Sequence, residues 1–294
     1  MSALLVIGDV VTDVVARYRP PLAPATDTAA RIRTLPGGAG ANVACWAARS
    51  RGNEVRILAR VGRDRASWHE ESLRRAGVRP LLVRDPEAPT ATVVALVGAD
   101  AERTFLTDSG AALRLAPADW SPGLLDGVGH LHLSGYLFYA ATSGETVSLA
   151  LAAALERGIP VSVDPASAGF LAELGVDRFL TAARGVEVLL PNAGEAALLT
   201  GRTGPAEAAA ELSRRFPLVA VTLGARGALV AAAGRVVARV PAPAVRAVDS
   251  TGAGDAFTGA FLAARLSGAG PAQAAAAGCD AGARAVTLVG GRPV

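Results

Sequence analysis

The sequence predicts an α/β protein whose mostly parallel central sheet is covered by helices on both faces. Short β-type runs alternate with Ala-rich helical patterns along most of the chain. The strand-like runs are apolar without polar alternation, which is typical of a sheet buried on both sides. With 294 residues, 51% of them hydrophobic, the chain is long enough to bury a large core.

The order of these patterns gives the expected elements. Strands are predicted at 4–7, 55–59, 130–133, 159–163 and 186–190. Helices are predicted at 39–51, 65–76, 143–157, 193–200 and 205–215. Three further strands with glycine turns predict an antiparallel edge, and two Ala-rich helices follow them: strands 218–222, 227–232 and 235–240, helices 254–266 and 271–286.

Two segments, 13–35 and 90–107, do not follow this rhythm. They are set off by prolines and contain β-type runs such as Thr92–Val97. One interpretation is a small separate sheet that lies as a lid over one edge of the main domain. The alternative is a pair of ordinary surface hairpins.

Composition excludes several classes of protein. All 29 basic residues are Arg, so a Schiff-base lysine and a P-loop lysine are both absent. A net charge of +3 without a long basic run disfavours nucleic-acid binding. Two distant Cys and three His indicate neither a disulfide framework nor a zinc site. The chain shows no signal-peptide pattern and no membrane-spanning stretch, so we expect a cytoplasmic protein without a membrane partner.

The sharpest local pattern is the run from Val248 to Leu262, in which acids and hydroxyls lead through two glycines into an apolar helix. Gly252 and Gly254 allow backbone amides to converge at a helix start, which suits a phosphoryl group in transfer. Asp255 at the same helix start could accept a proton from an alcohol. The alternative is a plain helix entry in which Ser250, Thr251 or Asp255 caps amides.

A glycine-rich segment, Pro36 to Asn42, opens an earlier helix. It lacks the third glycine of a dinucleotide fingerprint and does not follow a predicted strand, so a Rossmann site is disfavoured. A polar ligand could approach such a segment closely, with the Asn42 amide as donor and acceptor. A glycine turn with an Asn in the first helical turn is the alternative.

Two more motifs follow apolar strands. Asn192 and Glu195 stand three apart at a helix start, where a carboxylate could hold hydrated Mg²⁺ against phosphates or could simply complete a capping box. Thr222 to Gly227 could meet the phosphates of a nucleotide or form a hairpin turn. Asp9, Asp13 and Asp164 at strand ends could bind ligand hydroxyls or lie solvated in turns.

These motifs, in this order and at these distances, resemble the ribokinase-like (PfkB) carbohydrate kinase family over nearly the whole chain. The most specific element is the Asp249–Asp255 run, Asp-Ser-Thr-Gly-Ala-Gly-Asp. The resemblance implies one ribokinase-like domain over 1–294, a three-layer α/β/α fold with a small β-sheet lid formed by segments near 13–35 and 90–107. It also implies transfer of the γ-phosphoryl group of ATP to a hydroxyl of a monosaccharide or a close derivative.

The resemblance carries roles to matching positions of this sequence. By this resemblance, Asp255 corresponds to the catalytic base of the family. The backbone amides of Gly252, Ala253 and Gly254 correspond to its anion hole. The positions that match a sugar-binding role are Asp13, Gly37, Gly38 and Asn42. Asn192, Thr222, Gly224 and Gly227 match nucleotide-binding positions, and Glu195 matches a Mg²⁺ position that acts through water. Asp249 and Thr251 match a monovalent-cation site of some members, which implies a K⁺ requirement.

Departures from the family pattern bear on the substrate. Ribokinases proper have Asn where this chain has Val11 and Lys where it has Ala39. They also have an acidic residue at the strand end that corresponds to 132–135, and this chain has none there. Ribose is therefore disfavoured. A nucleoside kinase remains the alternative within the family, although the lid segments hold few aromatic residues. A non-catalytic sugar-binding protein on the same scaffold is the alternative of a different functional class. Unpaired lid strands predict a homodimer formed through the lid.

Overall fold

The larger of two sheets contains nine strands in the computed structural model, which describes residues 2–50, 52, 54–98 and 103–293. These strands are β1 (Ala3–Ile7), β4 (Glu54–Gly62), β5 (Val78–Asp85), β8 (Val128–Ser134), β9 (Val161–Asp164), β10 (Val188–Leu189), β11 (Leu218–Thr222), β12 (Ala228–Ala232) and β13 (Arg235–Val240). Their order is β13-β12-β11-β10-β9-β8-β1-β4-β5. The pairs from β5 to β11 are parallel, and β12 and β13 continue the sheet antiparallel.

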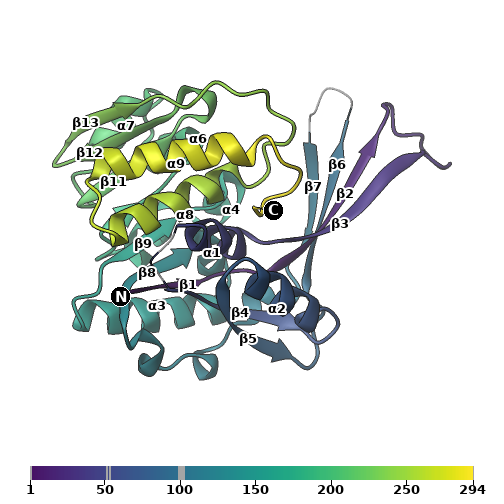
Figure 1. Cartoon of the computed structure of the whole chain (residues 1–294), viewed down its shortest axis with the longest axis horizontal. Coiled ribbons are helices and arrows are strands. Elements are labelled where there is room, and N and C mark those ends of the chain that lie inside the picture. Colours follow the sequence, from purple (N-terminus) through teal and green to yellow (C-terminus); the bar gives the residue numbers. More distant parts are fainter. Residues whose placement is uncertain (1, 51, 53, 99–102, 294) are drawn as a thin grey trace.

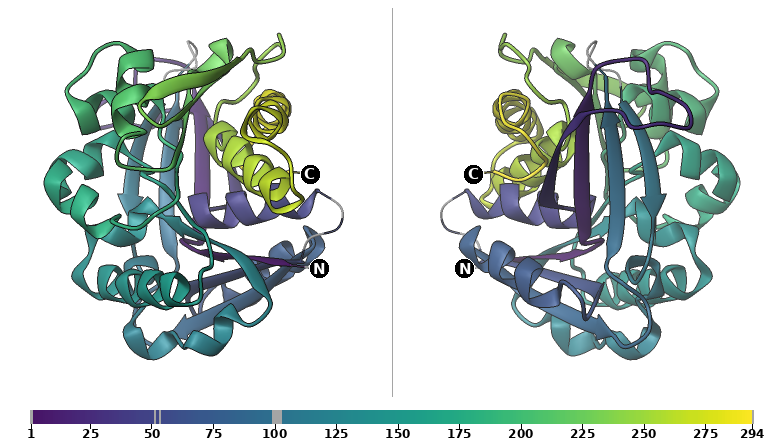
Figure 2. Two further views of the ribbon diagram at one scale, coloured as in Figure 1. Left: turned by 90° about the vertical axis from the view of Figure 1, so that its left-hand side faces the viewer. Right: turned by 90° about the vertical axis from the view of Figure 1, so that its right-hand side faces the viewer.

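Helices cover both faces of this sheet (Figures 1 and 2). One face packs against α1 (Ala39–Ala48), α2 (Ala66–Arg75), α8 (Ala253–Leu266) and α9 (Pro271–Ala285). The other face packs against α3 (Ala141–Glu156), α4 (Ala168–Leu174), α5 (Val176–Ala182), α6 (Ala193–Thr200) and α7 (Pro205–Leu212). Short 3₁₀ helices complete the described helices: η1 (Ala112–Arg114), η2 (Pro117–Asp119), η3 (Pro122–Leu125), η4 (Gly135–Tyr139) and η5 (Gly224–Arg226).

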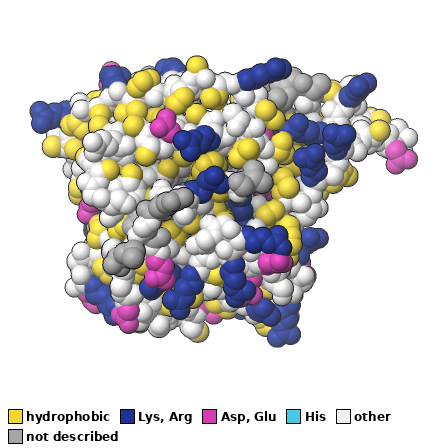
Figure 3. All heavy atoms as spheres, viewed as in Figure 1, with side chains coloured by type: hydrophobic (Ala, Val, Ile, Leu, Met, Phe, Trp, Pro, Cys, Tyr) yellow, Lys and Arg dark blue, Asp and Glu magenta, His cyan; other side chains and the backbone are white. Residues whose placement is uncertain are grey.

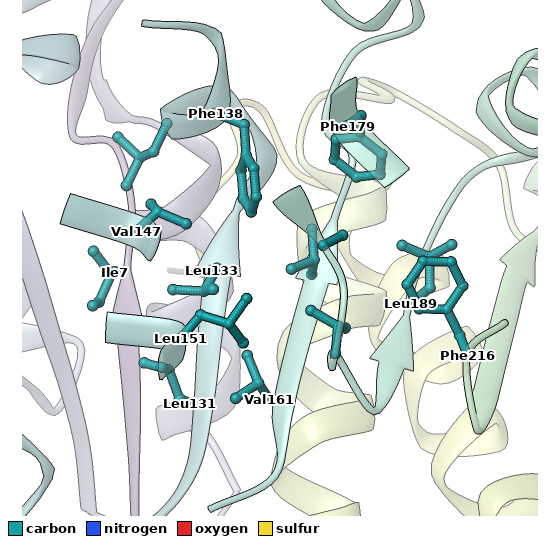
Figure 4. Close-up of a cluster of buried hydrophobic side chains, with 14 of the residues drawn as sticks. Ile7, Leu131, Leu133, Phe138, Val147, Leu151, Val161, Phe179, Leu189 and Phe216 are labelled. Carbon is teal, nitrogen blue, oxygen red and sulfur yellow. The ribbon is translucent and has the colours of Figure 1, made fainter. Parts of the chain in front are cut away.

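The apolar strands supply both halves of the core. In β1, Leu4 and Val6 belong to the cluster on one face, whereas Leu5 and Ile7 belong to the other, as the two-residue period of a strand requires. Figure 4 shows Phe179 and its neighbours filling the space between the sheet and the α3-to-α7 layer. Phe179 is fully buried, which contributes about 1.5–3 kcal/mol relative to an exposed side chain.

A second, four-stranded sheet stands beside one end of the large sheet (Figure 1). It consists of β2 (Val11–Tyr18), β3 (Ala30–Gly37), β6 (Ala91–Val97) and β7 (Arg103–Asp108), in the order β3-β2-β6-β7. The central pair β2–β6 is parallel, and each outer pair is antiparallel. Residues far apart in sequence thus form one sheet, which we call the small sheet.

On the face seen in Figure 3, arginine and acidic side chains are mixed over the region of α2 and β5. Ion pairs join Arg74 to Glu70, Arg75 to Glu71 and Arg84 to Glu70 in this region. All five side chains are wholly or partly exposed, so each pair contributes little to stability. No described helix is both long and apolar enough to cross a membrane.

The predicted fold class is confirmed, and most predicted elements are found within a few residues of their expected ends. Strand β5 was not predicted, because it is an edge strand interrupted by Pro80, and a proline weakens a strand pattern although it is accepted at sheet edges. The short helices α4 and α5 were not predicted either. Arg51 at the end of a predicted helix, and residues 99–102 in the second unusual segment, lie outside the described residues.

Candidate active site

A cavity of about 1030 Å³ lies between the large sheet, the small sheet and the start of α8. It is large enough for two small-molecule ligands side by side. Of the fifteen residues predicted for the site, ten line it: Asp13, Gly38, Asn42, Asn192, Glu195, Thr222, Thr251, Gly252, Gly254 and Asp255. The other five are not among its described lining residues: Gly37, Ala253, Gly224, Gly227 and Asp249.

The start of α8 forms one wall of the cavity. Gly252 has φ 74°, a left-handed conformation that favours glycine, and a Cβ atom added there would lie 2.4 Å from the Cα atom of Gly291. The first turn of α8 offers backbone amides that have no partner four residues earlier in the helix. An added Cβ on Gly254 would meet nothing within 4 Å, so this side of the turn is open to a ligand.

Asp255 lies in the same first turn and faces the glycine-rich segment. Its Oδ2 atom accepts a hydrogen bond of 2.8 Å from Nδ2 of Asn42 in α1. Burial raises the pKa of Asp255 well above its usual range, the Asn42 bond opposes this rise, and the neighbouring Asp164, Asp9 and Asp13 add to it. A carboxylate with a raised pKa is suited to taking up a proton near neutral pH.

The glycine-rich segment turns sharply into α1. Gly38 has φ 99°, and an added Cβ would lie 2.6 Å from the carbonyl oxygen of Asp9. Asp9 is buried and accepts hydrogen bonds from the Ala39 and Gly40 amides and from the Ser134 hydroxyl. Asp9 is therefore not solvated in a turn: its oxygens hold the start of α1, and the residue also lines the cavity.

Asp13 extends from β2 of the small sheet into the cavity. Gly37 supports its carboxylate, because a Cβ atom added at Gly37 would lie 2.1 Å from Oδ2 of Asp13. Burial raises the pKa of Asp13 to about 7, and Arg292 opposes the rise.

Asn192 and Glu195 form the capping box that the sequence offered as one alternative. The Asn192 side chain accepts a hydrogen bond from the Glu195 amide, while the two Glu195 carboxylate oxygens accept from the amide and the Nδ2 of Asn192. Burial raises the pKa of Glu195, and the nearby Asp164 adds to the rise. Glu195 is nevertheless part of the cavity wall, so the cap and a ligand role are compatible.

Thr222 ends β11 beside Asn192, to which it is joined by an isolated β-bridge. Gly224 and Gly227 shape the turn that follows. Gly227 has φ 91°, and its Cβ would lie 1.9 Å from the carbonyl oxygen of Val240, so only glycine fits there. Asp249 is buried and accepts hydrogen bonds from the amides of Thr251 and Gly290.

Asp164, one of the strand-end acids named from the sequence, accepts hydrogen bonds from the Ala166 amide and the Thr258 hydroxyl and lines the same cavity. Three aromatic lining residues were not predicted from the sequence. Tyr136, Tyr139 and Phe170 come from η4 and α4 and contact one another, with Tyr139 and Phe170 stacked at 5.3 Å. Apolar residues in short helices resemble ordinary core residues, so no sequence signal marked them.

The residues that line the cavity include six acids and, among those described, no arginine: Asp9, Asp13, Asp108, Asp164, Glu195 and Asp255. A phosphate-bearing ligand would meet strong repulsion there without a cation. Among the described residues, no cluster of three His, Cys, Asp or Glu side chains could hold a metal by itself. The donor set therefore fits a hydrated Mg²⁺ that is held largely by phosphate oxygens, the usual arrangement for this ion.

Comparison with known proteins agrees with this geometry. The family model described as pfkB family carbohydrate kinase matches residues 1–293. The chain belongs to the pfkB family of carbohydrate kinases. Members of this family are phosphotransferases with a hydroxyl acceptor, so the predicted family and the predicted enzyme class are both confirmed.

Individual known proteins are similar to this chain over most of their length. The chain is 32% identical to a fructokinase of Klebsiella pneumoniae, covering 88% of this chain and 82% of that one. An E. coli structure described as a putative ribokinase II in complex with ATP and Mg²⁺ has a TM-score of 0.86 at 25% identity, over 99% and 94% of the two chains. An adenosine kinase from Sinorhizobium meliloti has a TM-score of 0.88 at 23% identity, over 100% and 96%, which shows the shared fold alone.

Proposed function

We propose that this kinase transfers the γ-phosphoryl group of ATP to a hydroxyl of a monosaccharide or a close derivative. The observation that carries the proposal is the joint position of Asp255, the open first turn of α8 and Asn42 at one cavity wall. A base, amide donors for phosphoryl oxygens and an amide for the acceptor would thus meet at one point.

In this proposal Asp255 is the general base. Its carboxylate takes the proton of the acceptor hydroxyl as that oxygen bonds to the γ-phosphorus and the bond to ADP breaks. The amides of Gly252, Ala253 and Gly254 hold the phosphoryl oxygens during transfer, when negative charge develops on them. The Asn42 amide fixes the orientation of Asp255, and burial supports the role by raising the pKa of this carboxyl group.

The nucleotide end of the cavity would be formed by Asn192, Thr222, Gly224 and Gly227. The E. coli relative described in complex with ATP and Mg²⁺ supports these ligands. Mg²⁺ would neutralise phosphate charge, and Glu195 would hold it through water, since both oxygens of Glu195 already accept hydrogen bonds. We further propose K⁺ near Asp249 and Thr251; comparing rates in KCl and NaCl tests this.

The acceptor would bind at Asp13, Gly37, Gly38 and Asn42. Asn42 Oδ1 is buried without a hydrogen-bond partner, so a substrate hydroxyl that donates to it would remove an unfavourable state. The glycines allow close approach, and Asp13 supplies acceptor oxygens from the small sheet. In this proposal the chain is one kinase domain, and the small sheet is the lid that excludes water.

A nucleoside is the second candidate acceptor, and one observation favours it. Tyr136, Tyr139 and Phe170 form an aromatic wall in the cavity, outside the lid segments. Aromatic rings of this kind can stack on a nucleobase. The lid segments hold few aromatic residues, which disfavoured a nucleoside in the sequence. Because this aromatic wall lies outside the lid segments, their composition is weak evidence against a nucleoside.

A homodimer through the lid is also proposed. Ile32 in β3 and Leu106 in β7 are 63% and 57% exposed, and they lie on the outer strands of the small sheet. Exposed apolar side chains on edge strands favour pairing with a second copy. Light scattering tests this proposal, and a monomeric mass at micromolar concentration would refute it.

The experiment that tests the function is an ADP-release assay with Mg-ATP and separate pentoses, hexoses, sugar acids, sugar phosphates and nucleosides. Turnover with one monosaccharide class supports the proposal, and selective turnover of nucleosides supports the second candidate. If no compound is turned over but one raises the Tm, the protein is a non-catalytic binding protein and the proposal is wrong.

A further inference from the structure

Arg292 is a buried arginine at the far side of the wall that carries Asp13. Its side chain is enclosed, and the residue is 9% exposed. The guanidinium donates to the carbonyl oxygen of Gly37 at 2.8 Å and to the hydroxyl of Ser72 in α2 at 2.9 Å, while its Nε has no partner. None of these described contacts is a carboxylate, although burying an unpaired charge is costly.

The contact with Gly37 connects Arg292 to Asp13. Arg292 holds the Gly37 carbonyl, and the Asp13 carboxylate lies directly against the Cα atom of the same glycine. The two residues before Arg292 are closely packed. Trp46 in α1 donates to the Gly291 carbonyl, and a Cβ atom added at Gly290 would lie 3.0 Å from Cδ1 of Leu35 in β3. If the guanidinium of Arg292 shifted, Gly37 would shift with it, and the Asp13 carboxylate that packs against Gly37 would change position.

The charges around Asp13 are otherwise negative. Asp9 from the turn after β1 and Asp249 from the loop before α8 face it as like charges, and Arg292 is the basic group that opposes them. Around Arg292 itself lie Asp13, Asp9 and the Cys45 thiol of α1. The His69 ring of α2 is also in its field; it contacts the Thr12 hydroxyl at 3.1 Å.

We propose that Arg292 is a positioning residue for the acceptor site, which holds the Gly37 turn beneath Asp13 and supplies the positive charge behind this carboxylate. The proposal rests on the proposed role of Asp13 in binding acceptor hydroxyls. An ionised Asp13 accepts hydrogen bonds from two hydroxyls, whereas a protonated one loses part of this capacity. Arg292 thus acts on acceptor binding through Asp13 without touching the substrate.

The test compares Arg292→Gln and Arg292→Lys, with Arg265→Gln as the matched control. Arg265 also donates to a backbone carbonyl, that of Ala269, but lies at the opposite end of α8 from Asp255. For each protein, KM for the acceptor, KM for ATP and the pH profile of kcat/KM are measured with the acceptor that the wild type turns over. The same substitution is also made in an Asp13→Asn background.

We expect Arg292→Gln to raise the acceptor KM about tenfold at pH 7 and to change the ATP KM less than about twofold. The acid limb of the kcat/KM profile should move up by about one pH unit, because a nearby opposite charge typically lowers a carboxyl pKa by one unit or more. Arg292→Lys should restore most of the affinity and the position of the limb. In the Asp13→Asn background, Arg292→Gln should change the acceptor KM less than about twofold.

An unchanged acceptor KM, an equal rise in both KM values without a shift of the limb, or an undiminished effect in the Asp13→Asn background would overturn the proposal. If Arg292→Gln does not fold, Ser72→Ala decides, since it releases the guanidinium from α2 and should raise the acceptor KM about threefold with the same selectivity. Wild-type protein that turns over no acceptor would instead refute the proposed function.

Discussion

Replacement of Gly252 by Ala tests how the start of α8 is held, because the structure separates two costs at this position. The first is backbone strain: a φ of 74° costs a non-glycine residue about 1 kcal/mol. The second is a collision, since the new Cβ would lie 2.4 Å from the Cα atom of Gly291 and 2.7 Å from its carbonyl oxygen. Overpacking against backbone costs about 1–3 kcal/mol, so we expect a total of about 2–4 kcal/mol.

Activity should fall with stability, because Gly291 connects this turn to the base. Gly291 accepts a hydrogen bond from Trp46 and lies against the Asn42 amide, which in turn binds Asp255. A displaced Gly291 moves Asn42, and misplacement of catalytic groups by about 1 Å can cost about 100-fold in rate. We therefore expect kcat to fall at least tenfold.

Two other glycines serve as controls in urea and thermal unfolding. Gly201 has φ 69° with no atom near an added Cβ, so Gly201→Ala should cost only the strain, about 1 kcal/mol. Gly254 has neither strain nor contact, so Gly254→Ala should be neutral or stabilising, as Ala favours a helix. Equal losses for Gly252→Ala and Gly201→Ala would show that the contact with Gly291 contributes nothing, which would refute the reasoning.

Two further predictions concern buried titratable groups: Asp85, and the pair His130 and His132. Asp85 is 1% exposed and accepts hydrogen bonds from Arg60, Arg114 and two backbone amides, which hold the pKa of Asp85 below its usual range although burial opposes this. Asp85→Asn should therefore lower the free energy of unfolding by about 3 kcal/mol at pH 7, as measured in urea. This difference should shrink as the pH falls below about 4, where Asp85 is protonated in the unfolded state. A loss at pH 7 below about 0.5 kcal/mol would contradict this account. Burial lowers the pKa of His130 to about 4 and of His132 to about 3, and both rings contact the Ser162 hydroxyl at 2.9 Å. Between pH 7 and 5 both histidines therefore stay neutral in the folded state but take up protons in the unfolded state. The Tm should consequently fall steadily as the pH is lowered over this range. Replacing both histidines by Gln should reduce the slope of Tm against pH between pH 7 and 5. An unchanged slope would contradict the role given to the two histidines.

Local patterns were sufficient for much of the fold. The strands at Leu218–Thr222 and Arg235–Val240 and the helix at Ala193–Thr200 have the predicted ends, because turn glycines and the Asn192 cap fix them within a few residues. The small sheet was harder. Its central parallel pair joins Val11–Arg17 to Ala91–Val97, and such a pairing depends on contacts far apart in the chain rather than on local periodicity.

The same distinction applies to the site. Asp255, Asn42 and Glu195 stand in motifs with recognisable spacing, and the structure brings all three to one cavity. Arg292 and Phe170 belong to no motif, since one follows the last helix and the other lies in a short apolar helix. Their significance comes from what packs against them, which only the tertiary structure provides.

The most direct test of the central claim is the comparison of wild type and Asp255→Asn in transfer of phosphate from ATP to the acceptor, with the phosphorylated product identified by mass. Asn has nearly the same size and can still accept the Asn42 hydrogen bond, so the fold should be kept. Loss of a general base should lower kcat about 10²- to 10⁴-fold, while acceptor binding changes little. A variant that retains wild-type kcat would contradict the assignment of Asp255 as the base.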